Sequence, residues 1–154
     1  MDKVVIYVDG GARRNGEENN PAGYGVLLQW GFNTKELYQG FRGKTNNQME
    51  IMAAIAGLRA MKRTDIPVEI RTDSAYVCNC INKGWYKKWM SNGWVTSAKK
   101  PVENRELWIE LIDLIQKFDF ISFVKVKGHS DDEGNNRADY LANKGMDAVS
   151  WETL

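Results

Sequence analysis

The feature that most constrains this chain is the run of β-favouring residues near its start, Val4 to Val8. An unbroken apolar run of this kind, rather than an alternating one, is typical of a strand that is buried on both faces of a sheet. The run ends at Asp9-Gly10-Gly11. An acid that closes such a strand has to be solvated, hydrogen-bonded or bound to a cation. The chain is therefore expected to build a covered sheet, with Asp9 at one end of its first strand.

Hydrophobic periodicity along the rest of the chain predicts further elements in a defined order. Strands are expected over 4–8, 24–30, 34–41, 68–72 and 121–127. Helices are expected over 47–62, 73–82, 103–118 and 136–144, the last closed by Gly145, with a short helix and a loop between 83 and 102. This order predicts an α/β fold in which helices pack on a mixed sheet.

Length and composition fit one soluble domain. A chain of 154 residues allows one sizeable core, so 1–154 is expected to be a single domain with a short tail at 146–154. No apolar run approaches the ~20 residues of a membrane span, and Met1 is not followed by a signal-peptide pattern. A cytoplasmic protein without a membrane partner is therefore expected.

Cys78 and Cys80 are too close in sequence for a relaxed disulfide and are expected as reduced thiols.

Four acids stand out because of where the expected elements place them. Asp9 and Asp73 follow the first and fourth strands, and their carboxylates would emerge at one end of the sheet if these strands are parallel neighbours. Glu50 lies in the first turn of the first helix, and Asp139 lies in the first turn of the last helix. The spacing alone does not unite the four into one site.

Each acid also has an ordinary structural interpretation. Either Asn47 with Glu50 or Thr45 with Gln48 would form a capping box at the start of the first helix. Asp73 suits the N-cap of the second helix, and an acid such as Asp139 is favourable near any helix N-terminus.

Carboxylates that are brought together repel one another unless a hard cation neutralises them. Oxygen ligands with open coordination positions suit Mg²⁺ or Mn²⁺. Two such ions about 4 Å apart are a standard arrangement for phosphodiester cleavage. His129, the only histidine, lies on a polar, glycine-flanked stretch before the helix that carries Asp139. This setting favours a proton carrier near the metals over a core histidine.

A basic segment forms the second signal. No acid occurs from Ser74 to Val102, and the cations there are Lys83, Lys87, Lys88, Lys99 and Lys100. Trp85, Trp89 and Trp94 lie among these lysines. Lysines for phosphates and aromatic faces for sugars and bases indicate nucleic-acid binding. The alternative is a solvated charged helix that tryptophans anchor.

Taken together, these residues resemble the ribonuclease HI family from Lys3 to about Gly145. The motifs that carry the resemblance are Tyr7-Val8-Asp9-Gly10, Thr45-Asn46-Asn47-Gln48-Met49-Glu50, Thr72-Asp73-Ser74-Ala75-Tyr76-Val77, Lys99-Lys100-Pro101-Val102, Val126-Lys127-Gly128-His129 and Asn136-Arg137-Ala138-Asp139. Each is weak alone, but their order is specific.

The resemblance implies a five-stranded mixed sheet ordered 3-2-1-4-5, with the first three strands antiparallel. It implies endonucleolytic cleavage of the RNA strand of RNA–DNA hybrids, which leaves 5′-phosphate and 3′-hydroxyl ends. Two Mg²⁺ ions would be held by the four acids Asp9, Glu50, Asp73 and Asp139, with Asp9 bridging them. His129 would assist water activation or product departure.

The resemblance also implies substrate contacts. Asn46 and Asn47 would reach the minor groove, where a hybrid displays 2′-hydroxyls. Thr45 and Asn104 would hold a DNA phosphate, and Trp85 would pack on a deoxyribose. The segment 83–100, with Lys87, Lys88, Lys99 and Lys100, resembles the basic protrusion of cellular members.

Two departures from the family pattern concern substrate contacts. Ala75 replaces a glutamine that touches substrate in many bacterial members. The loop 11–20 is longer than usual, and the minor-groove asparagine of the family matches Asn15 or Asn20. Arg13 and Arg14 are hypothesised to contact phosphates instead.

Other functions remain as alternatives at this point. A transposase or junction resolvase of the same fold would share the acids, and a catalytically silent hybrid-binding module would share the substrate contacts. The nuclease part of a reverse transcriptase is a third alternative. A monomer without an obligate protein partner is expected, because no exposed heptad pattern or apolar stripe is evident.

Overall fold

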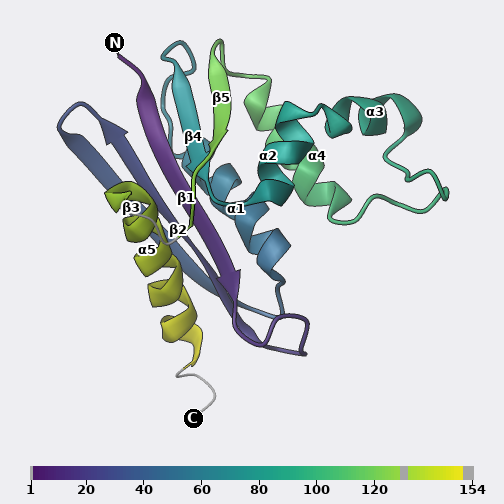
Figure 1. Ribbon diagram of the computed structural model, residues 1–154, viewed down its shortest axis with the longest axis horizontal. Coiled ribbons are helices and arrows are strands. Elements are labelled where there is room, and N and C mark those ends of the chain that lie inside the picture. The colour runs from purple at the N-terminus through teal and green to yellow at the C-terminus, as the bar shows by residue number, and fades with distance from the viewer. Residues whose placement is uncertain (1, 129–131, 151–154) are drawn as a thin grey trace.

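The computed structural model describes residues 2–128 and 132–150, which form a five-stranded sheet with helices on both faces (Figure 1). The strands are β1 (Val4–Ala12), β2 (Pro21–Trp30), β3 (Asn33–Arg42), β4 (Val68–Thr72) and β5 (Ile121–Lys125). The helices are α1 (Asn46–Arg59), α2 (Ala75–Asn82), α3 (Trp85–Asn92), α4 (Arg105–Ile115) and α5 (Glu133–Ser150). The sheet order is β3-β2-β1-β4-β5. The predicted α/β class and strand order are confirmed.

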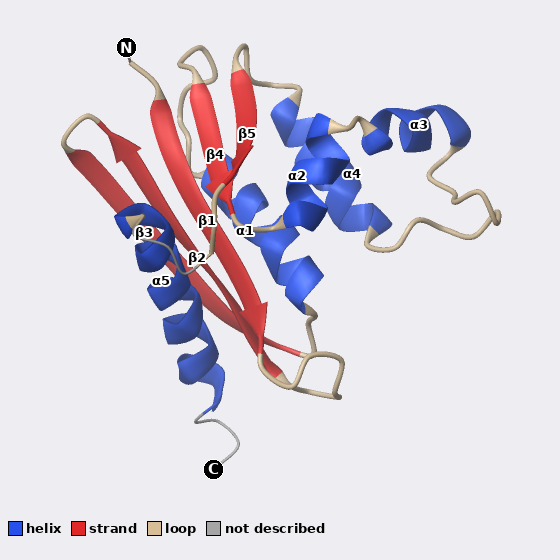
Figure 2. Cartoon of the chain, in the orientation of Figure 1, coloured by secondary structure: helices blue, strands red, loops and turns tan. Residues whose placement is uncertain are grey.

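The direction of each strand agrees with the expectation. β1, β2 and β3 are antiparallel neighbours, whereas β1 and β4, and β4 and β5, are parallel. Figure 2 shows α5 alone on one side of the sheet and α1, α2 and α4 on the other. The central strand β1 is therefore covered on both faces, and this is why its sequence begins with an unbroken apolar run.

β1 supplies side chains to two cores. Val4, Ile6 and Val8 belong to the large core beneath α1, α2 and α4. Tyr7 points the other way and packs with Leu27 and Ala138 beneath α5. Alternate residues of one strand thus fill both layers, as the period of a β-strand requires.

The N-terminus of α1 shows which of the two candidate capping boxes forms. Thr45 is the N-cap, its side chain accepts from the Gln48 amide, and the Gln48 side chain accepts from the Thr45 amide. The capping box is therefore Thr45 with Gln48, and Glu50 is free of that role. α1 lies close to the sheet at Gly57, where an added Cβ would come within 2.8 Å of Ile6 Cγ2.

Two predicted boundaries near the site were wrong in an informative way. β1 continues past Asp9 to Ala12, because β2 pairs with it along that stretch. α5 begins at Glu133 and runs through Gly145 to Ser150, although Gly145 was expected to end it. This glycine lies against the backbone of β3, with an added Cβ only 2.6 Å from the Gln39 carbonyl oxygen. It permits a close helix–sheet contact and is not a C-cap.

The remaining boundaries differ by a few residues. β2 starts earlier than predicted, at Pro21, and α1 ends earlier, at Arg59. α4 and β5 are also shorter at their ends than the predicted 103–118 and 121–127. Cys78 and Cys80 are free and buried, in agreement with the prediction of reduced thiols.

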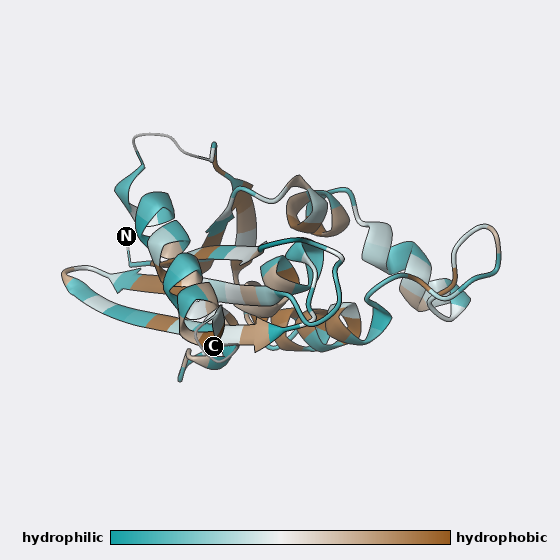
Figure 3. Ribbon diagram, turned by 90° about the horizontal axis from the view of Figure 1, so that it is seen from below, coloured by the Kyte–Doolittle hydropathy of each residue, from teal (hydrophilic) through white to brown (hydrophobic). Residues whose placement is uncertain are grey.

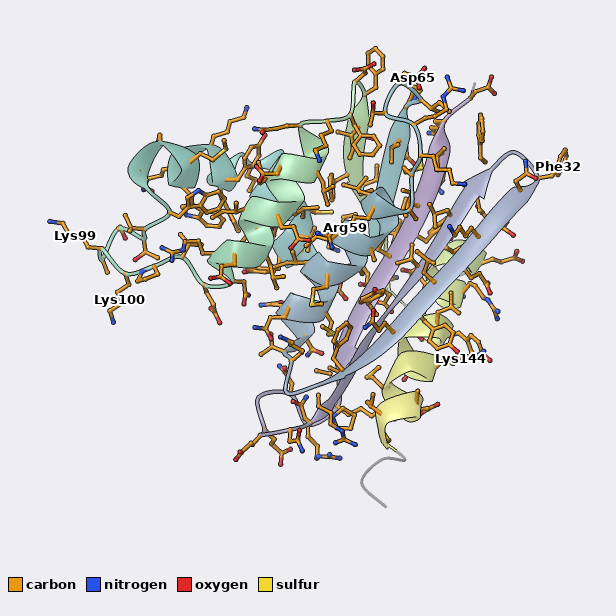
Figure 4. All side chains as sticks on the ribbon, turned by 180° about the vertical axis from the view of Figure 1, so that it is seen from behind. Phe32, Arg59, Asp65, Lys99, Lys100 and Lys144 are labelled. Atoms are coloured by element: carbon orange, nitrogen blue, oxygen red, sulfur yellow. The ribbon has the colours of Figure 1, made fainter. Side chains whose placement is uncertain are left out.

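The basic segment projects from the body of the molecule. Figure 3 shows α3 and the following loop extending away from the sheet at one end, with hydrophilic residues along most of the loop. No residue of α3 is fully buried, but Trp89 packs on Trp94 and on the buried Trp108 of α4. Lys99 and Lys100 lie at the outer end of the loop (Figure 4). Trp89 and Trp94 therefore anchor the segment, and its lysines face solvent.

Across the part of the chain that the structure describes, no helix is both long enough and apolar enough to cross a membrane.

Gly25 offers a test of the close contact between α5 and the sheet. An added Cβ would lie 2.2 Å from the Ala138 carbonyl oxygen, so Gly25→Ala has to push α5 away. We expect the free energy of unfolding to fall by about 3 kcal/mol, or roughly 10 °C in Tm. Urea and thermal denaturation measure this loss.

Gly11→Ala is the matched control in a neighbouring strand. Its nearest neighbour is the flexible end of Met146, with Cε at 3.1 Å, so a loss of less than about 1 kcal/mol is expected. Equal losses in the two variants would contradict the importance of the α5 contact.

Candidate active site

Three carboxylates meet at one end of the sheet. Asp9 comes from β1, Glu50 from α1 and Asp73 from the residue after β4, and their oxygen atoms lie within 4.8 Å of one another. The parallel pairing of Tyr7 with Arg71 places position 9 level with position 73. Two acids at equivalent places after parallel strands therefore emerge side by side, as the sequence predicted.

The backbone and β4 hold the Glu50 carboxylate. Gly10 N donates to Glu50 Oε1 at 2.9 Å, and Thr72 Oγ1 donates to Glu50 Oε2 at 3.2 Å. Gly10 also lets α1 approach β1, because a Cβ there would lie 2.4 Å from the Met49 carbonyl carbon. The glutamate is therefore fixed at both of its oxygens and aimed at Asp9.

The other ordinary interpretations of the acids also fail. Ser74, and not Asp73, caps α2, since its side chain accepts from the Val77 amide at 3.1 Å. Asp139 lies beyond the first turn of α5, whose amides at Gly134 and Asn135 donate to Asp132. Neither Asp73 nor Asp139 is explained by a helix end.

Asp139 reaches the cluster from the opposite face of the sheet. It lies close enough to Asp9 to contribute to the raised pKa of that carboxyl. The approach depends on Gly25, which pairs with Asp9 across β1 and β2 and leaves room for α5 at Ala138. Glu50 and Asp73 thus cluster with Asp9, and Asp139 adjoins Asp9 from the other side of the sheet.

Electrostatics make this arrangement unfavourable in the absence of a cation. Burial is the main cause that raises the pKa of Asp9, followed by the charges of Glu50 and Asp73. The pKa of Glu50 is also raised, first by burial and then by the charge of Asp73, although its hydrogen bonds from Gly10 and Thr72 oppose the shift. Asp9 and Glu50 are only 6% and 7% exposed, so water screens their repulsion little.

The donor set fits a hard divalent cation. The clustered ligand atoms are all carboxylate oxygens, two of the acids are buried, and the fourth acid lies against the first. Oxygen-only sets of this kind suit Mg²⁺ or Mn²⁺ rather than zinc. A divalent cation would also reverse the unfavourable electrostatics of the cluster.

The start of α1 brings two predicted substrate residues beside the acids. Thr45 caps the helix, and Asn46 and Asn47 follow it as exposed residues one turn before Glu50. Asn46 Oδ1 accepts from the Ala12 amide at 2.6 Å. The asparagines therefore lie between the carboxylates and the loop 11–20.

The structure of this loop distinguishes Asn15 from Asn20, the two candidates for the minor-groove contact. Asn20 is 1% exposed and donates to the carbonyl oxygens of Arg13 and Lys44, so it holds the loop together from inside. Asn15 is exposed, and its Oδ1 accepts from the Asn46 amide at 3.0 Å. Of the pair, only Asn15 stands at the surface next to Asn46.

Arg13 has a structural partner. Its guanidinium forms an ion pair with Asp147 at 2.7 Å and contacts Asn143 and Ser150, which ties the loop to the end of α5. The hypothesised phosphate contact therefore rests on the exposed Arg14.

The remaining predicted substrate residues lie on the other side of the α1 N-terminus. Asn104 precedes α4, and Trp85 begins α3 and is 39% exposed. Lys87 and Lys88 are exposed on α3, whereas Lys99 and Lys100 lie farther out in the loop (Figure 4). The lysines are not gathered at the carboxylates. His129 lies outside the described residues.

Sequence reasoning missed three supports of the site. They are the Thr72 hydroxyl and the Gly10 amide, which hold Glu50, and Tyr76, which contacts Asn104. The first two directly adjoin predicted acids in the chain. Tyr76 gave no such signal, because its partner is distant in sequence.

Asp9→Asn is expected to stabilise the protein when metal is absent. The pKa of Asp9 is higher in the folded chain than in the unfolded chain, so the folded state keeps a proton that the unfolded state loses. The contribution of protonated Asp9 to the free energy of unfolding of the wild type is therefore present below about pH 4 and is lost as pH rises above it. The advantage of the variant should grow between about pH 5 and pH 8, to on the order of 2 kcal/mol. Urea denaturation in EDTA at both pH values measures it.

Asp113→Asn is the control, because it makes the same change at an exposed residue of α4. It should leave stability nearly unchanged at either pH. Added Mg²⁺ should raise the Tm of the wild type more than that of Asp9→Asn. An Asp9→Asn variant that is less stable than the wild type in EDTA would count against a repulsive cluster.

Comparisons with known proteins agree with the fold. The sequence model of the RNase H family matches residues 1–147. A ribonuclease H from Clostridium botulinum (strain Hall) is 48% identical over 147 residues, which cover 96% of this chain and 97% of that protein. A ribonuclease H from Chlorobium phaeobacteroides (strain BS1) is 48% identical over 144 residues, which cover 94% and 95%.

Solved structures show the same likeness. LC9-RNase H1, a type 1 RNase H with the type 2 active-site motif, has a TM-score of 0.83 at 26% identity, covering 96% of this chain and 74% of that one. LC11-RNase H1, solved in complex with an RNA/DNA hybrid, has a TM-score of 0.72 at 28% identity, covering 96% and 99%. With its sheet order and its cluster of carboxylates, the chain belongs to the RNase H family, and it is an enzyme of the ribonuclease H type.

Proposed function

We propose that this protein hydrolyses the RNA strand of RNA–DNA hybrids endonucleolytically and leaves 5′-phosphate and 3′-hydroxyl ends. The observation that carries the proposal is the convergence of Asp9, Glu50 and Asp73, with Asp139 against Asp9, at one end of the sheet. LC11-RNase H1, which shares the fold, was solved with an RNA/DNA hybrid. These acids lie next to exposed asparagines suited to a nucleic-acid groove.

The proposal includes two Mg²⁺ ions, for which Mn²⁺ can substitute, and the four acids would hold them. Bound ions of this kind activate water and stabilise the charge of the leaving oxygen. Gly10 and Thr72 keep the Glu50 carboxylate oriented toward Asp9. Asp139, which α5 carries on the other face of the sheet, would complete the set beside Asp9.

His129 is proposed to carry protons beside the acids. The support comes from the residue before it, since Gly128 lies so close to Asp73 that an added Cβ would be 2.9 Å from Asp73 Oδ2. The chain thus reaches the carboxylates one residue before the histidine. An imidazole is the side chain best suited to accept and return a proton at neutral pH.

The RNA strand is proposed to be read in the minor groove by Asn15, Asn46 and Asn47. These side chains are exposed, and Asn15 is hydrogen-bonded to the Asn46 amide. Carboxamides donate and accept hydrogen bonds, so they suit a groove that displays 2′-hydroxyls and base edges. Their place one turn before Glu50 would bring the strand that bears 2′-hydroxyls to the acids.

The DNA strand is proposed to be held at Thr45 and Asn104. A cavity of about 480 Å³ lies beside them, lined by Lys44 and Arg105 as well as Asn104. The N-terminus of α4 opens there, and the positive end of the helix dipole favours an anion, although Glu106 and Glu110 also line the cavity. Beyond it, Trp85 would pack on a deoxyribose.

Lys87, Lys88, Lys99 and Lys100 would add sequence-independent attraction to the phosphates of the hybrid. One chain carries the acids, the asparagines and the basic segment, so the proposed enzyme acts as a monomer.

The first test uses an RNA–DNA duplex with a labelled RNA strand, incubated with the protein and Mg²⁺. We expect cleavage of the RNA strand only, and none with EDTA, double-stranded RNA or double-stranded DNA. Asp9→Asn should lower kcat by about 10³-fold or more, because several kcal/mol of transition-state stabilisation depend on the ions. Asp113→Asn should match the wild type. Cleavage of DNA, or hybrid binding without cleavage by the wild type, would overturn the proposal.

The two asparagines of the loop make a second test. Asn15→Ala should raise KM for the hybrid about fivefold with Tm unchanged, because it removes one exposed polar contact. Asn20→Ala should instead lower Tm by several degrees, because it leaves buried carbonyl groups unpaired. The reverse pattern in KM and Tm would assign the contact to Asn20.

A further inference from the structure

The hydroxyl of Tyr76, on α2, is a junction between two residues of the next long helix. Asn104 Nδ2 donates to Tyr76 Oη at 3.2 Å, and Trp108 Nε1 donates to the same oxygen at 3.0 Å. Asn104 immediately precedes α4, and Trp108 lies one turn further along it. One phenolic oxygen therefore accepts from both side chains.

The backbone of Asn104 shows that its side chain is not used as a cap. Its φ of 61° is left-handed, a conformation that asparagine tolerates better than most residues. An asparagine before a helix ordinarily accepts from the first amides, but here no side-chain cap bond is made. The carboxamide turns to Tyr76 instead and keeps a second N–H for another acceptor.

The Tyr76 hydroxyl is held rigidly on its other side. Trp108 has no exposed surface, and its indole N–H can only donate, so it needs an acceptor inside the protein. The Tyr76 ring also packs on the Trp108 ring, with centroids 5.2 Å apart and planes inclined by 55°. Trp89 packs on the same indole at 6.2 Å. The oxygen that meets Asn104 is therefore held by a partly buried aromatic cluster around the buried Trp108.

We infer that Tyr76 is a positioning residue that orients the Asn104 carboxamide toward the cavity beside α4, so that its free N–H is ready for a phosphate oxygen of the DNA strand. This inference rests on the proposed function. Because Tyr76 already restricts the Asn104 side chain in the free protein, less conformational entropy is lost when substrate binds. The Tyr76 hydroxyl should therefore affect substrate affinity and not the chemical step.

Tyr76→Phe tests the inference because it removes the oxygen and keeps the ring. In steady-state cleavage of an RNA–DNA hybrid with Mg²⁺, we expect KM to rise about fivefold and kcat to change by less than about twofold. Tyr86→Phe is the matched control on the neighbouring helix α3, where the described contacts include no hydrogen bond from the hydroxyl. It should leave both constants unchanged. An unchanged KM for Tyr76→Phe would overturn the inference.

A double-variant cycle separates positioning from a merely structural effect. Asn104→Gly removes the carboxamide without straining the left-handed backbone. In that background Tyr76→Phe should add no further rise in KM, because the side chain it orients is gone. A rise as large as in the wild type would show that the hydroxyl acts through packing and would overturn the inference.

A measurement independent of activity keeps the two proposals distinguishable. The Asn104 side-chain amide should give a shifted NMR signal with faster proton exchange in Tyr76→Phe than in Tyr86→Phe. An unaltered signal would overturn the inference even if hybrid cleavage is confirmed. A wild type that fails to cleave the hybrid would refute the proposed function, and the amide signal would still decide whether Tyr76 orients Asn104.

Discussion

The repulsion among the buried carboxylates is the constraint on which the rest of this structure depends. If Asp9, Glu50 and Asp73 were all ionised, each pair, with ligand oxygens within 4.8 Å, would repel by at least about 3.5 kcal/mol at an effective dielectric constant of 20. Their clustering is opposed further by burial, which raises the pKa values of Asp9 and Glu50. The fold must therefore hold these groups together by packing that is unrelated to the charges.

Close backbone approach supplies that packing on both sides of β1. Gly10 lets α1 lie against the strand and bring Glu50, whereas Gly25, the cross-strand partner of Asp9, lets α5 lie against β2 and bring Asp139. Neither position could carry a side chain without moving a helix. The covered centre of the sheet is thus a requirement of the site, because only a strand with a helix on each face can receive acids from both.

The sequence predicted the sheet and the acids because both depend on local pattern. An apolar strand that ends at Asp9 and a second, parallel strand that is followed by Asp73 are enough to place two carboxylates at one edge. The full length of α5 was not predictable, because a glycine that meets Gln39 looks like a helix stop. The choice between Asn15 and Asn20 likewise depends on burial in a folded loop. Contacts between distant residues, such as Tyr76 with Asn104, leave no periodic signal.

The site acids of the described residues have no lysine or arginine as an ion-pair partner, and this matters for the binding of a divalent cation. Glu69 is paired with Lys3 and Arg71, but among residues 2–128 and 132–150 no ion pair joins a lysine or arginine to any of the four site acids. A guanidinium in the cluster would stabilise the fold, yet it would neutralise the charge that attracts a divalent ion. With the lysines placed on a projecting segment, the same chain can attract phosphates at one place and retain unpaired carboxylates at another.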